Sequence, residues 1–150
     1  MNSDFRDLLQ QCAGDEVRYL VMGGYAVIHH SEPRFTRDLD IWLEPTEQNA
    51  ARAARALRKF GIPLIEVTQA DLAVPGTQLM VGMPPCAIDL LTSCPPMVFA
   101  ECWENRATVV DRGLTIQFMG KADLMIAKEA TGRPQDLADL AKLRMDWEEE

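Results

Sequence analysis

A short apolar run at 17–22 ends directly in two adjacent glycines, Gly23 and Gly24. Such a run is typical of a buried strand that enters a turn, and a short helix at 25–30 would follow it. Glycine lets the backbone approach a ligand closely, and the N–H groups at the start of a helix can bind phosphate oxygens. Gly23 and Gly24 are therefore candidate phosphate-binding residues, although a lone pair of glycines is more often only a turn.

The next segment, 35–43, alternates with a period of two, which predicts a strand with Phe35 and Leu39 on one face and Trp42 on the other. Asp38 and Asp40 are two positions apart, so both carboxylates would leave the same face. Two buried like charges are unfavourable unless a cation neutralises them, and carboxylate oxygens suit Mg²⁺ or Mn²⁺. The alternative is that the two aspartates form the polar outer face of an edge strand.

Asp89 interrupts an otherwise apolar strand predicted at 86–92. A charge within such a strand needs a partner. If this strand pairs beside the strand that carries Asp40, Asp89 completes a metal site or takes a proton from an attacking hydroxyl. A salt bridge to an arginine is the other interpretation.

Strands and helices alternate irregularly along the rest of the chain, and helices close it. The remaining predicted elements are a helix capped by Ser3 or Asp4, a helix capped by Thr46 and ended by Gly61, a strand at 78–83, a helix at about 97–105, a hairpin with strands at 107–110 and 114–118, and helices at about 121–131 and 134–147. This order predicts an α+β or mixed α/β domain.

Length and charge limit the class of protein. A chain of 150 residues suits one domain over 1–150, onto which the helices from about 121 would pack. The 15 basic and 23 acidic residues give a net charge of −8, which argues against general binding of nucleic acid. No apolar run approaches the roughly 18 residues of a membrane span, and the start lacks signal-peptide character, so we expect a cytoplasmic protein. The four cysteines lack zinc-site spacing and are expected to be reduced thiols.

Lys128 lies on the apolar stripe of its predicted helix, one turn after Leu124. An inward-facing lysine needs an anion, and a nucleoside triphosphate is one candidate. Asp136 and Asp139 share a face of the last helix, so either could instead pair with Lys128 or Arg133 and lock the two helices together. These two interpretations have similar weight.

Basic side chains also recur at helical spacing within 46–60. They could meet RNA phosphates together with Arg34 and Arg37, but such a stripe is more often a solvated helix face. Its members are Arg52, Arg55, Arg58 and Lys59.

Gly23-Gly24, the Asp38-x-Asp40 pair and the later lone Asp89 together resemble the nucleotidyltransferase superfamily with the DNA polymerase β-type fold. Segments 36–40 and 128–140 are most similar to its AbiEii-like branch, which includes toxin–antitoxin and phage-defence proteins. The resemblance implies a minimal fold in which a mixed β-sheet is flanked by helices, with a helical C-terminus. It also implies transfer of a nucleoside monophosphate from a nucleoside triphosphate (NTP), bound with divalent ions, to a hydroxyl acceptor.

The resemblance also implies roles for particular residues. Asp38, Asp40 and Asp89 would be catalytic and would bind Mg²⁺ or Mn²⁺. The nucleotide contacts would be Gly23, Gly24, Arg37, Lys128 and Asp136. Many relatives have serine where this chain has Gly24, which would leave only backbone donors for the phosphates at that position.

The acceptor would be RNA, a protein or a small molecule, and a toxin or antitoxin is a candidate partner. The alternative function is a nucleotide-binding or catalytically weak module that acts through a protein partner. A structural domain whose aspartates only form hydrogen bonds is a third interpretation.

Overall fold

The structure is a computed structural model, which describes residues 1–82 and 86–149. Within these residues one mixed β-sheet forms the centre of the molecule, with the strand order β3-β4-β2-β1-β6-β5. The strands are β1 (Tyr19–Met22), β2 (Leu39–Leu43), β3 (Gln78–Val81), β4 (Ile88–Leu91), β5 (Ala107–Asp111) and β6 (Leu114–Phe118). β2 runs parallel to β4 and β1 runs parallel to β6, whereas the other neighbouring pairs are antiparallel. The α+β class predicted from the sequence is confirmed.

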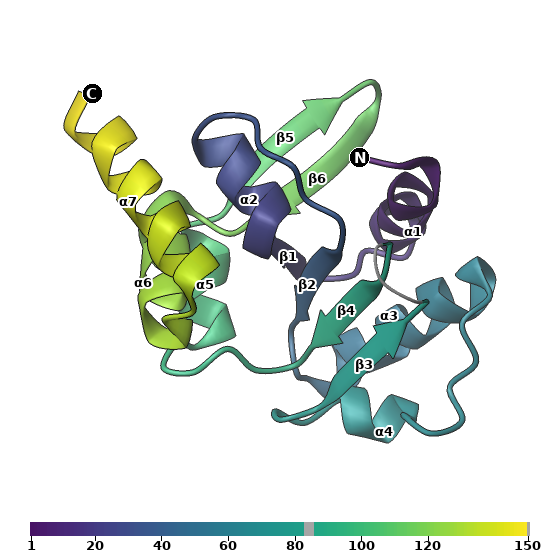
Figure 1. The fold of residues 1–150 in the computed structure, drawn as a ribbon. Helices are drawn as coiled ribbons and strands as arrows, with labels where there is room; N and C mark the ends of the chain where they lie inside the picture. The colour runs from purple at the N-terminus through teal and green to yellow at the C-terminus, as the bar shows by residue number, and fades with distance from the viewer. Residues whose placement is uncertain (83–85, 150) are drawn as a thin grey trace.

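Helices cover the sheet, and the last two close the chain. They are α1 (Ser3–Gly14), α2 (Gly23–His30), α3 (Glu47–Phe60), α4 (Gln69–Leu72), α5 (Phe99–Glu104), α6 (Lys121–Thr131) and α7 (Pro134–Glu149). α6 packs side by side with α7, and α2 contacts both of them as well as β1 and β2 (Figure 1). α2 therefore joins the C-terminal helices to the centre of the sheet.

The second strand is shorter than the sequence predicts. Residues 32–38 have no regular secondary structure, and Phe35 is 76% exposed instead of facing the core. Trp42 is buried, as Leu39 and Ile41 are, so β2 is covered on both faces. The period of two was misleading because residues 35–38, which supply half of the alternation, lie in irregular backbone before the strand. Asp38 accordingly precedes the strand instead of lying in it.

Some of the predicted helix ends and turns are confirmed, and others are wrong. Thr46 caps α3 and Gly61 ends it in the left-handed conformation, as predicted. The hairpin of β5 and β6 is also confirmed. At α1 the capping side chain is Asn2, which accepts from the N–H of Phe5, and not Ser3 or Asp4. The short α4 was not predicted.

The predicted strand at 86–92 is observed as β4, whereas β3 ends at Val81 and residue 83 of its predicted range lies outside the described residues. All four cysteines are free thiols. No helix within 1–82 and 86–149 combines the length and the apolar character that a membrane span requires.

Asn49 is a buried polar residue that connects α3 to two strands. Its side chain accepts a hydrogen bond from the N–H of Arg18 at 2.8 Å. The amide group donates to the carbonyl oxygens of Arg18 at 2.9 Å and Glu44 at 3.0 Å. The N–H of Arg18 depends on the first of these bonds, whereas the two carbonyl oxygens also accept from the backbone N–H groups of Glu44 and Thr46.

We expect Asn49→Ala to lower the free energy of unfolding by about 2–3 kcal/mol, because it removes three hydrogen bonds and leaves the N–H of Arg18 without its partner. The exposed neighbour Gln48 provides a matched control, since Gln48→Ala should change stability by less than about 0.5 kcal/mol. Urea denaturation of the three proteins measures the difference. Equal stability of the two variants would show that the Asn49 hydrogen bonds contribute nothing.

Candidate active site

A pocket of about 470 Å³ lies where the start of α2, the segment before β2 and the junction of α6 with α7 meet. Every residue that the sequence predicted for the site lines this pocket, with the exception of Asp89. The lining residues are Gly23, Gly24, Arg34, Phe35, Thr36, Arg37, Asp38, Asp40, Lys128, Arg133, Pro134, Gln135 and Asp136. The fold thus brings together residues from four separate parts of the chain.

The two glycines at the start of α2 are required for different reasons. Gly23 has a φ of +64°, in the left-handed region, and a Cβ there would overlap the carboxylate of Asp40. Gly24 has no such backbone constraint, but its Cβ would overlap the hydroxyl of Thr36 and lie 3.0 Å from Nη2 of Arg34. No side chain caps α2, so its first N–H groups are available to an anion.

Parallel pairing of β2 with β4 places Asp40 directly beside Asp89 in the register. Residues paired in this way project from the same side of a sheet. Asp89 accepts two hydrogen bonds from Nε2 of Gln78, at 2.9 and 3.1 Å. Its partner is therefore a neutral amide on β3, and the interpretation of an arginine salt bridge is wrong. Asp38 accepts a bond from the N–H of Ala87 at 2.9 Å.

Asp40 is the carboxylate of this group with no hydrogen-bond donor among the described residues. Burial raises its pKa to about 6, and the negative charges of Asp89 and Asp38 act in the same direction. Lys128 and Arg133 oppose them. The protein thus offsets the negative charge around Asp40 only in part.

A hard divalent cation fits this donor chemistry, because carboxylate oxygens are its preferred ligands. Within the described residues, however, no three His, Cys, Asp or Glu side chains form a ready-made metal cluster. The reason is visible in the hydrogen bonds, since Asp38 is bonded to the backbone and Asp89 to Gln78. Asp40 would be the first ligand, and the other two carboxylates would join it in competition with these bonds.

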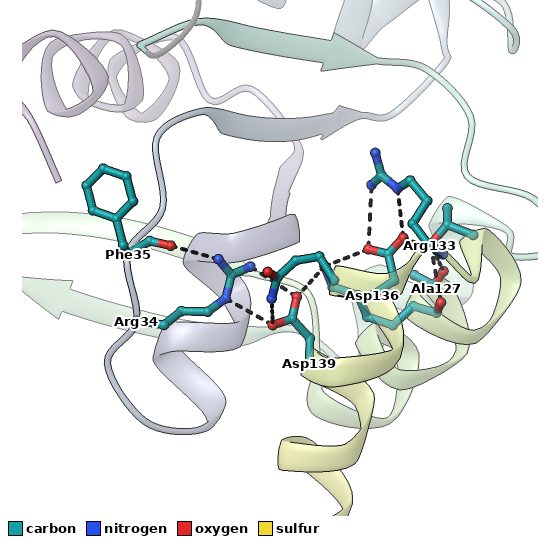
Figure 2. Close-up of polar contacts among 9 residues, drawn as sticks. Arg34, Phe35, Ala127, Arg133, Asp136 and Asp139 are labelled. Carbon is teal, nitrogen blue, oxygen red and sulfur yellow. Dashed lines mark hydrogen bonds and ion pairs between the residues drawn. The ribbon is translucent and has the colours of Figure 1, made fainter.

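The opposite wall of the pocket is built around Lys128, whose side chain is 8% exposed. Its Nζ lies 3.2 Å from Oδ1 of Asp136 and 3.0 Å from Oδ2 of Asp139. Asp136 also pairs with Arg133 at 2.8 Å, and Asp139 pairs with Arg34 (Figure 2). These contacts agree with the interpretation in which charged residues lock α6 to α7. A contact of Lys128 with a nucleotide stays a prediction.

Arg34 was missed as a residue of the site, because the sequence placed it only near a basic surface. Its side chain is 18% exposed and it joins the segment before β2 to α7 through Asp139. Arg133 and Gln135 also line the pocket although only a helix-locking contact had been considered for Arg133. The irregular backbone at 32–38 gives no periodicity from which the direction of Arg34 could be read.

The basic stripe on α3 does not line the pocket. Arg55 and Lys59 form ion pairs with Asp15, the residue that caps the C-terminal end of α1, at 3.8 and 3.1 Å. Both side chains are more than half exposed. The stripe has the character of a solvated helix face that helps α3 to pack on α1.

Burial would raise the pKa of Asp136, but hydrogen bonds from Arg133 and Lys128 and the positive charge of Lys128 outweigh this effect and lower it. A carboxyl group with a lowered pKa in the folded state stabilises the fold above its unfolded pKa of about 3.9. This contribution is lost as the pH falls below that value.

We therefore expect Asp136→Asn to lower the free energy of unfolding by about 2 kcal/mol at pH 7. The loss is moderate because Asp139 remains beside Lys128. Between pH 4 and pH 2 the difference from the wild type should shrink, because the unfolded wild-type chain takes up a proton at Asp136 that the folded chain does not. Denaturant titrations across this range test the assignment, with Asp7→Asn on the exposed face of α1 as the control. A difference that does not change with pH would contradict it.

The chain matches one family model and shares its fold with solved structures. The family model described as "Nucleotidyltransferase of unknown function (DUF6036)" matches residues 3–146. No curated protein matches the chain. The crystal structure of the lincosamide antibiotic adenylyltransferase LnuA with lincomycin bound has a TM-score of 0.64 and 15% identity, over 96% of each chain. A protein from Thermotoga maritima assigned as a nucleotidyltransferase has a TM-score of 0.61 and 14% identity, over 92% of this chain and 88% of that chain.

At these identities the two solved structures establish the shared fold. The family model covers nearly the whole chain. The chain belongs to the nucleotidyltransferase family that this model describes.

Proposed function

We propose that this nucleotidyltransferase transfers a nucleoside monophosphate from an NTP to a hydroxyl acceptor, with Mg²⁺ or Mn²⁺ bound at Asp38, Asp40 and Asp89. The proposal rests on the Asp40 carboxylate, whose charge the protein offsets only in part and which lies beside the glycine turn at the start of α2. We treat residues 1–150 as one nucleotidyltransferase-like domain, with the helices from 121 onward packed onto it.

The two walls of the pocket have opposite roles in this proposal. The N–H groups at Gly23 and Gly24 and the cationic side chains of Arg37 and Lys128 hold the phosphates. Asp136 acts indirectly, because it holds Lys128 in place. A divalent cation on the aspartates would neutralise charge on the phosphates and on the leaving group.

In the transfer step, the acceptor oxygen forms a bond with the α-phosphorus, and the bond from that phosphorus to the β-phosphate oxygen breaks. Pyrophosphate leaves with the electron pair of the broken bond. Asp89 takes the proton of the acceptor hydroxyl, or orients that hydroxyl for attack. Since β4 lies on the side of β2 away from β1, we place the acceptor on the β4 side of Asp40.

Two classes of acceptor have support. The fold shared with an adenylyltransferase that has lincomycin bound supports a small molecule that carries a hydroxyl. The resemblance of residues 36–40 and 128–140 to the AbiEii-like branch supports an RNA or protein acceptor within a toxin–antitoxin or defence system. A screen of labelled NTPs with Mg²⁺ against bulk tRNA, cell protein and hydroxylated small molecules distinguishes the classes.

We expect Asp40→Asn to lower transfer at least about 100-fold, because the charge that holds the cation is removed. Asp7→Asn, on the exposed face of α1, should keep wild-type activity. Chelation by EDTA should abolish transfer in the wild type, and added Mg²⁺ should restore it. Full activity of Asp40→Asn, with unchanged folding by circular dichroism, would refute the assignment.

The catalytically weak module remains a second candidate, because Asp89 is held by Gln78 and no metal cluster is ready-made within the described residues. In that case, Mg²⁺ with an NTP raises the melting temperature, since selective binding to the folded state stabilises it. No label is then transferred to any acceptor, while a protein partner binds tightly. Label transfer that depends on Asp40 excludes this candidate.

A further inference from the structure

We propose that Arg34 and Thr36, which lie over the glycine turn of α2, bind the triphosphate of the nucleotide, and that Asp139 positions Arg34 for this contact. The inference rests on the proposed function and concerns the same pocket. It adds two side chains to the backbone donors of Gly23 and Gly24.

The hydroxyl of Thr36 occupies the space into which a side chain at position 24 would project. An ideal Cβ on Gly24 would overlap this hydroxyl and lie 2.9 Å from the Thr36 Cβ. Thr36 lines the pocket, and its hydroxyl has no hydrogen-bond partner among the described residues. A hydroxyl group is therefore present beside the first turn of α2, although the turn itself is Gly-Gly, and it is free to donate to a phosphate oxygen.

Arg34 is held at the same place by protein contacts. Its Nη2 donates to Oδ2 of Asp139 at 3.0 Å, and its Nη1 donates to the carbonyl oxygen of Phe35 at 2.8 Å (Figure 2). Nε lies 3.0 Å from Oδ1 of the same aspartate. Asp139 is 1% exposed, so the guanidinium is fixed in a defined orientation. A guanidinium has five N–H donors, and at least two remain for a ligand after these contacts.

The charges on this wall favour an anion. Three cations, Arg34, Lys128 and Arg133, share two carboxylates, Asp136 and Asp139. Three positive charges therefore meet two carboxylates on this wall, where Arg34 and Lys128 are largely buried and Arg133 is exposed. Asp40 carries negative charge that Lys128 and Arg133 offset only in part. A triphosphate with a bound divalent cation complements both walls at once, because its phosphates face the arginine and its metal faces the aspartates.

Magnesium tripolyphosphate tests the inference directly, because it carries the phosphates without a base. We expect Thr36→Val to weaken its binding about 5- to 10-fold, since the shape is kept and one hydrogen bond to a charged group is lost. Arg34→Gln should weaken it at least about 10-fold. Isothermal titration calorimetry gives the affinities, and thermal unfolding checks that each variant is folded. Since Arg34→Gln loses an ion pair and can be destabilised, Thr36→Val keeps the test decisive.

Two variants outside the pocket serve as matched controls. Thr115→Val on β6 and Arg58→Gln on α3 remove the same chemical groups from residues that do not line it. Both should bind magnesium tripolyphosphate as the wild type does. If Thr36→Val and Arg34→Gln bind no more weakly than these controls, the inference is overturned.

A reciprocal exchange tests the spatial argument. Gly24→Ser alone should weaken binding, because its side chain collides with Thr36, and Thr36→Gly alone should also weaken it. The double variant Gly24→Ser/Thr36→Gly moves the hydroxyl to the other side of the same space and should recover at least part of the lost affinity. A double variant weaker than both single variants would overturn the argument.

The positioning role of Asp139 has its own readout. Asp139→Asn should weaken tripolyphosphate binding in the wild-type background and have little further effect when Arg34→Gln is already present. Equal losses in both backgrounds would show that Asp139 does not act through Arg34.

Failure of this inference can be told apart from failure of the proposed function by titration of Mg-ATP and Mg-GTP. If the wild type binds these nucleotides and Asp40→Asn does not, while the Arg34 and Thr36 variants bind normally, only the inference fails. If the wild type binds neither nucleotides nor tripolyphosphate, both are wrong.

Discussion

Two carboxylates face each other across neighbouring parallel strands, and much of the structure can be understood from this one unfavourable contact. Asp40 and Asp89 are aligned by the β2–β4 register, which the buried residues of both strands fix. A shift of one residue would exchange the two buried faces of β2. The apolar core therefore maintains a repulsion that the aspartates alone would avoid, and it does so beside a turn in which glycine leaves room for Asp40.

The C-terminal helices supply the opposite charge. Lys128 on α6 lies between two carboxylates of α7, and Arg34 reaches the same α7 from the other end of the sequence. Buried ion pairs are only weakly stabilising in themselves, since desolvation offsets much of the attraction. They do fix geometry, however. The cations are held next to the aspartate wall without neutralising Asp40, so the pocket keeps separate positive and negative sides.

Much of the site could be predicted from the sequence because its residues interrupt regular patterns. Asp89 breaks an apolar strand, and Lys128 breaks the apolar stripe of a helix. Arg34 and Thr36 interrupt nothing, since they lie in an irregular segment whose course depends on contacts elsewhere. Asp139 could be placed near Lys128 by helix periodicity, but its pairing with Arg34 spans 105 positions and has no local signal. The start of β2 was wrong for a related reason, because residues 35–38 alternate like a strand but belong to the same irregular segment.

The single carboxylate of Asp139 serves two cations that come from different parts of the chain. A ligand that takes over some of the hydrogen bonds of Arg34 would leave more of this carboxylate to Lys128, so the docking of α7 and the occupancy of the pocket are thermodynamically linked. Such linkage is reciprocal. Amide exchange within the terminal helix would then slow when the pocket fills, and a partner that pulled this helix away from α6 would lower the affinity for whatever the pocket holds.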